Sequence, residues 1–341
     1  MKPLSRFAAI FFAFLATVSC HAAASTEACQ TGASTACYFA FEPPAAGGQL
    51  HYYASRVPGA SAAPTSALIA LHGHSRDANK TFDAALLAVR RAGRDADTLV
   101  IAPVFQVEAA RAANCRTAGV PAAQPGDLLW TCSSWLEGAA SANGSRFGSF
   151  AALDALVAEL VRQWPSLRSV TIAGFSAGAQ MVQHSIGFAA APPAGVTLRY
   201  VVADPGSWLY FDAFRPHPVD AANCPAVNRW KYGTESLPAH FTRDAAQARA
   251  HYAAAEIHYL EGELDSDAAK GTAYRVLDTS CAANAQGPFR LQRGQAYLTY
   301  DRALLAPAHR RELVVVPGCA HDVACVFPSP AASAALLGAP R

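Results

Sequence analysis

One serine lies in a five-residue pattern that suits a nucleophile. Ser176 is the centre of GFSAG (Gly174–Gly178), between the apolar run SVTIAG and the helix-favouring run AGAQMVQHSIG. A serine on a sharp turn from strand to helix has a strained backbone, so the residues two positions away on each side must be small. The turn exposes the hydroxyl, and the N-terminal end of the helix stabilises an anion that develops beside it. The pattern therefore predicts that Ser176 attacks a carbonyl carbon.

The elements that must position this serine are short apolar segments with helical segments between them. Apolar runs of this length are typical of parallel strands covered on both faces. Their alternation with helices predicts an α/β fold with a mostly parallel central sheet, which binds ligands at the carboxyl ends of its strands. The predicted strands are Ala67–His74, Thr98–Phe105, Ser169–Phe175, Tyr200–Gly206, Glu256–Asp265 and Glu312–Gly318, with Leu50–Arg56 as a candidate antiparallel edge strand, and the clearest helices are Thr81–Gly93 and Ser149–Pro165.

Two long segments interrupt this alternation, at about 107–148 and 207–250. Both are rich in aromatic residues, and the second also contains several prolines. Long irregular segments inside a compact domain are often lids or binding loops. Two interpretations of the aromatics stay open: they form an apolar pocket for an acyl or aryl group, or they attach the excursions to the sheet.

At this point the chain resembles the α/β-hydrolase superfamily, from about Leu50 to Phe327. The resemblance rests on four motifs in the family's order, LHGH, GFSAG, GELD and PGCAHD. Within the superfamily the chain is most similar to secreted microbial esterases and polyester-depolymerase-like serine hydrolases. The resemblance implies an α/β-hydrolase fold with helices on both faces of the sheet, as one domain over 25–341, and a triad in the chain order Ser, Asp or Glu, His.

That order leaves few candidates for the base and the acid. His309 and His321 are the histidines late enough in the chain, but His309 precedes the last predicted strand, whereas His321 follows it. We therefore expect His321 to be the general base. The acid should end the preceding strand, where Asp265 is preferred over Asp267, and Asp204 at the end of an earlier strand is a further alternative. The acid would hold the imidazole in one tautomer and stabilise its protonated form.

The resemblance also implies an oxyanion hole made of two backbone N–H groups. One belongs to Ala177, directly after the nucleophile, and the other to the loop after the LHGH strand. His74 is the predicted second donor, with Ser75 as the alternative. We expect the side chains of His72 and His74 to be structural rather than chemical.

The position of His321 between two cysteines raises the question of a zinc site. The stretch VPGCAHDVAC offers C-x-H-x-x-x-C at best, and no second cluster nearby completes four ligands. The chain has no C-x-x-C, H-E-x-x-H or phosphate-loop motif, so we expect no metal and no organic cofactor. In an exported chain, disulfides are the expected use of cysteine. Pairing of near neighbours in sequence predicts Cys29–Cys37, Cys115–Cys132, Cys224–Cys281 and Cys319–Cys325.

The N-terminus has the parts of a secretory signal peptide. Lys2 and Arg6 precede the apolar run FAAIFFAFLATV, and small residues follow at Ala22 and Ala24. The run is shorter than the roughly 20 residues that span a membrane, so we expect cleavage near Ala24 and no stable membrane insertion. Lipid attachment at Cys20 and a buried N-terminal helix are less favoured alternatives. The predicted location is secreted or periplasmic.

Charge and chemistry together define the predicted function. Without Lys2 and Arg6 the chain has 25 basic and 25 acidic side chains, so it lacks the basic excess that binds nucleic acid or anionic lipid. We predict a secreted serine hydrolase that cleaves carboxylic esters, small or polymeric, through an acyl-enzyme intermediate. The alternatives are a secreted serine peptidase on the same fold and a non-catalytic binding protein on a hydrolase fold. Nothing in the sequence indicates the oligomeric state.

Overall fold

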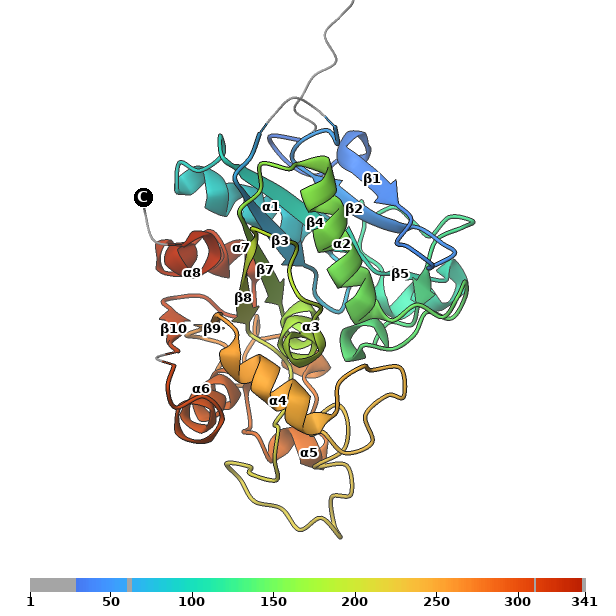
Figure 1. Cartoon of the computed structure of the whole chain (residues 1–341). Coiled ribbons are helices and arrows are strands. Elements are labelled where there is room, and N and C mark those ends of the chain that lie inside the picture. The colour runs from blue at the N-terminus through green and yellow to red at the C-terminus, as the bar shows by residue number, and fades with distance from the viewer. Residues whose placement is uncertain (1–28, 60–62, 310, 339–341) are drawn as a thin grey trace, which may run out of the picture.

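A mixed sheet forms the centre of the molecule (Figure 1). The computed structural model describes residues 29–59, 63–309 and 311–338, so the predicted signal peptide and its cleavage site lie outside the described residues. Within those residues the sheet has eight strands, in the spatial order β1 (Tyr38–Phe41), β2 (Leu50–Ala54), β4 (Thr98–Val104), β3 (Ser66–Leu71), β7 (Ser169–Phe175), β8 (Thr197–Ala203), β9 (Ile257–Gly262) and β10 (Leu313–Val316). The strands from β4 to β10 are parallel to one another, which confirms the mostly parallel sheet.

The antiparallel end of the sheet differs in one respect from the prediction. β2 pairs antiparallel with β4, as expected, but β2 is not an edge strand because β1 pairs with its other side. The register places Tyr38 opposite Tyr53 and Phe41 opposite Leu50. β1 has only four residues, too few for alternation to reveal it in the sequence.

Both faces of the sheet are covered by helices. In β3, Ala67, Ile69 and Leu71 belong to the core on one face, while Leu68 and Ala70 belong to the core on the other. Successive side chains of a strand point to opposite faces, so this strand is apolar throughout. One face packs against α1 (Ala78–Arg91), α7 (Val323–Val326) and α8 (Ser333–Leu337), and the other against α2 (Ser149–Gln163), α3 (Ala177–Ser185), α4 (Ala245–Ala254) and α6 (Arg290–Tyr300).

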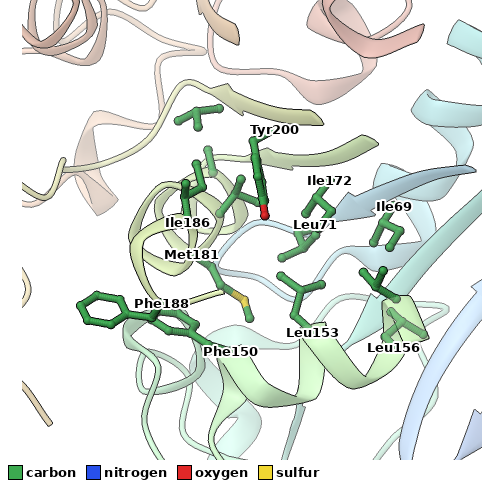
Figure 2. Close-up of a cluster of buried hydrophobic side chains, with 14 of the residues drawn as sticks. Ile69, Leu71, Phe150, Leu153, Leu156, Ile172, Met181, Ile186, Phe188 and Tyr200 are labelled. Carbon is green, nitrogen blue, oxygen red and sulfur yellow. The ribbon is translucent and has the colours of Figure 1, made fainter. Parts of the chain in front are cut away.

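The core under α2 and α3 holds the helix that starts beside Ser176. Leu153 and Leu156 of α2 point toward Ile69 and Ile172 of the sheet, and Met181 of α3 extends toward α2 in the same core (Figure 2). All five side chains are buried. Truncating one such side chain to alanine typically costs about 2–5 kcal/mol, so α3 is firmly anchored on the sheet.

Two segments of the chain are mostly irregular, one between β4 and α2 and the other between β8 and α4. The first contains a small parallel pair, β5 (Gln106–Val107) with β6 (Leu129–Trp130). The second is irregular to residue 244, but its last residues belong to α4, which corrects the predicted boundary at 250. In Figure 1 the second excursion extends beyond the carboxyl ends of β7 and β8.

The aromatic residues of the excursions serve as attachment. Trp208 stacks on Tyr297 of α6 at 4.3 Å between ring centroids. Trp135 stacks on Phe105, which directly follows β4, at 5.3 Å. Of the two interpretations left open by the sequence, the structure favours packing onto the sheet.

Four disulfides join the eight cysteines that the structure describes. They are Cys29–Cys37, Cys115–Cys132, Cys224–Cys281 and Cys319–Cys325, the same four pairs that proximity in sequence predicts. Cys115–Cys132 closes the first excursion on itself, and Cys224–Cys281 joins the second to α5 (Cys281–Asn284). In the part of the chain that the structure describes, every helix is too short or too polar to cross a membrane.

Candidate active site

Ser176 occupies the turn between β7 and α3 with a strained backbone. Its φ is 58° and its ψ is −120°, a sparsely populated combination for a residue with a side chain. A Cβ on Gly174 would lie 2.2 Å from the carbonyl oxygen of Gly178, and a Cβ on Gly178 would lie 2.4 Å from that of Leu71. Both glycines are therefore required by close backbone approach, as the spacing in GFSAG predicts.

His321 and Asp265 meet Ser176 at the carboxyl edge of the sheet. Asp265 lies three residues beyond β9, and His321 lies five residues beyond β10. His321 Nδ1 is 2.7 Å from Asp265 Oδ2, and His321 Nε2 is 2.8 Å from Ser176 Oγ. The structure thus brings the three residues that the sequence singles out into one hydrogen-bonded chain.

The two alternative acids have other partners. Asp267 is exposed, and its Oδ1 accepts the N–H of Ala269 at 2.7 Å, as a turn aspartate does. Asp204 is buried, and its Oδ1 accepts the N–H of Gly262 at 2.7 Å. Of the three carboxylates, Asp265 is the one whose hydrogen bond to the ring of His321 the structure shows.

Asp265 is held from the side opposite His321 by Arg290. Arg290 Nη1 lies 3.2 Å from Asp265 Oδ1 and 2.7 Å from the carbonyl oxygen of Thr272, and both charged side chains are buried. The backbone N–H of His321 donates to the carbonyl oxygen of Gly271 at 3.1 Å. The orientation of the imidazole is therefore fixed at the ring and at the main chain.

The surroundings keep the imidazole neutral. Burial lowers the pKa of His321 below its ordinary value, the hydrogen bond to Asp265 opposes this effect, and the Arg290 cation adds to it. At neutral pH the ring is therefore unprotonated, with its Nδ1–H donating to Asp265 and its Nε2 accepting from the Ser176 hydroxyl. This is the protonation state that a general base requires.

Two further buried acids lie behind Asp265. Burial, followed by repulsion from the Asp265 carboxylate, raises the pKa of Asp204 to about 7. Burial and the neighbouring Asp204 raise the pKa of Glu261 well above its ordinary value. The Glu261 carboxyl packs against α6, where a Cβ on Gly294 would lie 2.2 Å from Oε1.

The site does not favour a cation. Asp204, Asp265 and His321 each place one potential ligand atom within 4.8 Å of the others. However, both ring nitrogens of His321 already have hydrogen-bond partners, and the Arg290 cation lies beside Asp265. A metal ion would have to displace these interactions.

The predicted oxyanion donors lie beside the serine. Ala177 is the first residue of α3, so its N–H has no acceptor within the helix. The Gly73 N–H is already used, because it donates to Asp77 Oδ1 at 2.8 Å. His74 lines both cavities that adjoin Ser176, whereas Ser75 lines the larger one.

His72 is part of the support of this loop. Its Nδ1 donates to the carbonyl oxygen of Gly73 at 2.9 Å, and its Nε2 accepts the N–H of Phe105 at 3.3 Å. Burial lowers its pKa to about 4, so the ring is neutral. Arg76, two residues beyond His74, is buried and donates to the carbonyl oxygen of Cys115 at 3.0 Å, which ties the loop to the first excursion.

Two cavities meet at Ser176. The larger, of about 590 Å³, extends over His321, Asp322 and Val323 toward α1. The smaller, of about 150 Å³, extends over Ala177 and is lined by Gln180, Lys231 and Arg290. The sequence analysis did not identify these three residues. The spacing could have pointed to Gln180, because a residue four positions after Ser176 lies on the same face of the helix.

Together the sheet order, the strand-to-helix turn at Ser176 and the helices on both faces define an α/β-hydrolase fold. Poly(aspartic acid) hydrolase-1 from Sphingomonas sp. KT-1 is similar with a TM-score of 0.57 and 21% identity, over 84% of this chain and 93% of that chain. LpqC, a poly(3-hydroxybutyrate) depolymerase from Bordetella parapertussis, is similar with a TM-score of 0.56 and 18% identity, over 84% and 83%. Comparison with protein-family models and with curated proteins gives no match. At these identities the likeness establishes the shared fold.

Proposed function

We propose that the protein is an exported serine hydrolase that cleaves carboxylic esters with Ser176, His321 and Asp265. The observation that carries this proposal is the chain of two short hydrogen bonds from Ser176 Oγ through His321 to Asp265, at 2.8 and 2.7 Å. Four disulfides support an extracytoplasmic location, because disulfides persist in oxidising compartments. A buried neutral imidazole beside a serine on a strained turn has little purpose in a binding protein.

The geometry supplies each step of acyl transfer. Ser176 Oγ attacks the carbonyl carbon while His321 Nε2 takes the hydroxyl proton, and Asp265 stabilises the resulting imidazolium. The N–H groups of Ala177 and His74 bind the oxyanion, and each such donor contributes about 3 kcal/mol to transition-state stabilisation. His321 then gives the proton to the departing alkoxide, which leaves as the alcohol. Water, deprotonated by His321, attacks the acyl-enzyme and releases the acid and free Ser176.

The comparisons support a hydrolytic function and agree with a polymeric substrate. One structurally similar protein is described as a poly(aspartic acid) hydrolase and the other as a poly(3-hydroxybutyrate) depolymerase. Both cavities at Ser176 are open to solvent, so a chain can reach the serine from either side. Small esters and polymeric esters are both included in the proposal.

Labelling with a fluorophosphonate tests the nucleophile. Folded wild-type protein should be labelled, and Ser176→Ala should not be labelled while keeping its melting temperature within a few degrees. Parallel assays with aryl esters and peptide anilides test the bond that is cleaved, and we expect turnover of the esters. Absence of labelling in folded wild type would overturn the serine mechanism, and faster turnover of the anilides would replace the esterase with the peptidase.

A further inference from the structure

The turn that carries His74 is closed by hydrogen bonds of its own. The N–H of Arg76 donates to the carbonyl oxygen of Gly73 at 3.0 Å, and the N–H of Gly73 donates to Asp77 Oδ1 at 2.8 Å. The N–H of His74 has no acceptor in the part of the chain that the structure describes. It is therefore available to an oxyanion, provided that the turn is held in one orientation relative to Ser176.

Arg76 ends this turn with a backbone that is unfavourable for its residue type. Its φ is 53°, in the left-handed region, and the residue is only 3% exposed. A residue other than glycine in this region costs about 1–3 kcal/mol, so the conformation persists only where the surroundings hold it. The contacts of the buried side chain supply that restraint.

The guanidinium of Arg76 extends to the first excursion. Its Nε donates to the carbonyl oxygen of Cys115 at 3.0 Å, and its Nη1 donates to Gln106 Oε1 at 2.7 Å. Gln106 is buried, and its Nε2 donates to the Tyr38 hydroxyl at 3.0 Å and to the carbonyl oxygen of Pro121 at 3.1 Å. The amide that binds Arg76 is thus fixed at both of its ends.

Stability alone does not explain this buried cation. Among the described residues, the two acceptors of the Arg76 side chain are neutral oxygens, and no carboxylate pairs with it. Burial lowers the pKa of Arg76 below its ordinary value, because the charged form loses its hydration. Burying a cation without a counter-ion is unfavourable, so a requirement at the active site explains the contact better than a gain in stability does.

A second side chain of the first excursion holds the same turn. Thr117 Oγ1 donates to the carbonyl oxygen of Ser75 at 2.8 Å, so both Ser75 and Arg76, the two residues after His74, are bound to the excursion. The Cys115–Cys132 disulfide closes this part of the excursion on itself. A rotation of the turn that carries the N–H of His74 away from the nucleophile would break these bonds.

On the basis of the proposed function, we infer that Arg76 is a positioning residue for the oxyanion hole. Bound to the first excursion, it holds the turn so that the N–H of His74 points to the oxyanion that forms at Ser176. Arg76 lines neither of the two cavities at Ser176, so it acts through His74 and not on the substrate. Its loss should therefore leave substrate binding in place and weaken the binding of the transition state.

A boronic acid measures the oxyanion hole separately from substrate binding. Butylboronic acid is the boron counterpart of the pentanoyl group of 4-nitrophenyl pentanoate. Ser176 Oγ adds to the boron atom and its proton passes to His321, so the tetrahedral adduct is an anion with a boron-bound oxygen in the oxyanion position. We expect Arg76→Met to lower kcat for the ester about hundredfold and to raise the Ki of butylboronic acid about as much, with KM nearly unchanged, as a misplacement of ~1 Å does.

Fluorophosphonate labelling separates positioning from a merely structural role. It counts the active sites, so that kcat is given per site. A variant that only folds less well has fewer sites but keeps its Ki and its kcat per site. Thr117→Val removes the second bond to the turn with little change in shape, and it should shift kcat and Ki in the same directions as Arg76→Met, by a smaller factor.

Arg56→Met is the matched control at the opposite edge of the sheet. Arg56 also donates to two main-chain carbonyl oxygens, those of Asp95 and Ala96, both at 2.8 Å. It follows β2, which runs antiparallel to β4, and its partners precede β4, so it lies away from the carboxyl edge that holds Ser176. This variant should leave kcat per site and the Ki of butylboronic acid unchanged.

Each other outcome counts against a defined statement. Unchanged kcat per site and Ki in Arg76→Met and Thr117→Val would overturn the inference, as would a loss in folded Arg76→Met that is confined to KM or to the number of labelled sites. If Arg76→Met does not fold, Thr117→Val decides by the same two values. Hydrolysis of 4-nitrophenyl pentanoate that persists in Ser176→Ala would instead overturn the proposed function.

Discussion

Arg290 binds the carboxylate oxygen of Asp265 that is not hydrogen-bonded to His321. The distance between Arg290 Nη1 and Asp265 Oδ1 is 3.2 Å, while Asp265 Oδ2 lies 2.7 Å from His321 Nδ1. The carboxylate is thus fixed between a cation and the imidazole, out of contact with water. Arg290 acts by holding Asp265 and by its electrostatic effect on the imidazole of His321. It is therefore a positioning residue.

Replacing Arg290 should shift the pH profile of the enzyme. The Arg290 cation contributes to lowering the pKa of His321, so Arg290→Gln should raise that pKa. Because the base must be unprotonated, the acid limb of kcat/KM against pH should move to higher pH in the variant. The profile is measured with an uncharged aryl ester. Arg275→Gln, which removes an exposed cation nearby, should leave the limb in place. An unmoved limb in Arg290→Gln would show that Arg290 is merely structural.

The assignment of the acid predicts an unequal pair of variants. Asp265→Asn should reduce kcat by about four orders of magnitude, because the amide favours the wrong tautomer of the base. Asp204→Asn should reduce kcat far less, since Asp204 Oδ1 bonds to the Gly262 N–H rather than to the ring. Steady-state kinetics on both variants tests which aspartate is the acid. The reverse order of losses would transfer the acid role to Asp204.

Asp204 should destabilise the protein as the pH rises. Its pKa is about 7 in the folded state and near 3.8 when unfolded, so the folded state retains the proton over this range while the unfolded state releases it. The contribution of Asp204 to stability is therefore greatest below pH 4, falls between pH 4 and 7, and stays constant above. Asparagine cannot ionise, so Asp204→Asn lacks this loss of stability. The difference in free energy of unfolding between the variant and wild type should therefore rise by up to about 4 kcal/mol, in favour of the variant, between pH 4 and pH 8.

Urea unfolding at the two pH values measures this difference. Asp267→Asn is the matched control, since it makes the same exchange at an exposed aspartate. A relative stability of Asp204→Asn that does not change with pH would mean that Asp204 ionises normally in the folded state.

The disulfide around His321 should stabilise the site. Cys319 and Cys325 flank His321 and are bonded to each other, and the carbonyl oxygen of Cys319 accepts the N–H of Leu264, next to Asp265, at 2.8 Å. Replacing both cysteines by serine should cost about 2 kcal/mol in stability, from the chain entropy of a short loop. It should also lower kcat while keeping fluorophosphonate labelling of Ser176.

A remote disulfide provides the comparison. Cys29→Ser with Cys37→Ser should lower the melting temperature without a matching loss of kcat, because this pair lies beside β1, at the antiparallel end of the sheet. If both double variants affect turnover equally, the bridge at His321 has no special role in holding the base.

The topology of the sheet explains why the sequence is enough to predict Ser176, Asp265 and His321. Ser176, Asp265 and His321 come after three strands of the sheet, and parallel strands bring their carboxyl ends to one edge of the sheet. Apolar runs and a family motif were enough to place them. Arg290 and Lys231 could not be found in this way, because each follows an irregular segment whose path is set by tertiary packing. The short strand β1 was missed for a related reason, since four residues hold too little periodicity.

The Cys224–Cys281 bridge has a consequence for resistance to proteolysis. It closes a loop that contains Lys231, β9 and Asp265, together with the segment around Arg275 and Val276 at the mouth of the cavities. Val276 is 67% exposed, and Arg275 beside it is the kind of residue after which trypsin cuts. A single cut there would leave the two pieces covalently joined, with β9 and α6 still packed side by side. Nicked protein should therefore run as one band without reductant and as two with it, and the residues of the candidate site should stay together after a single cut.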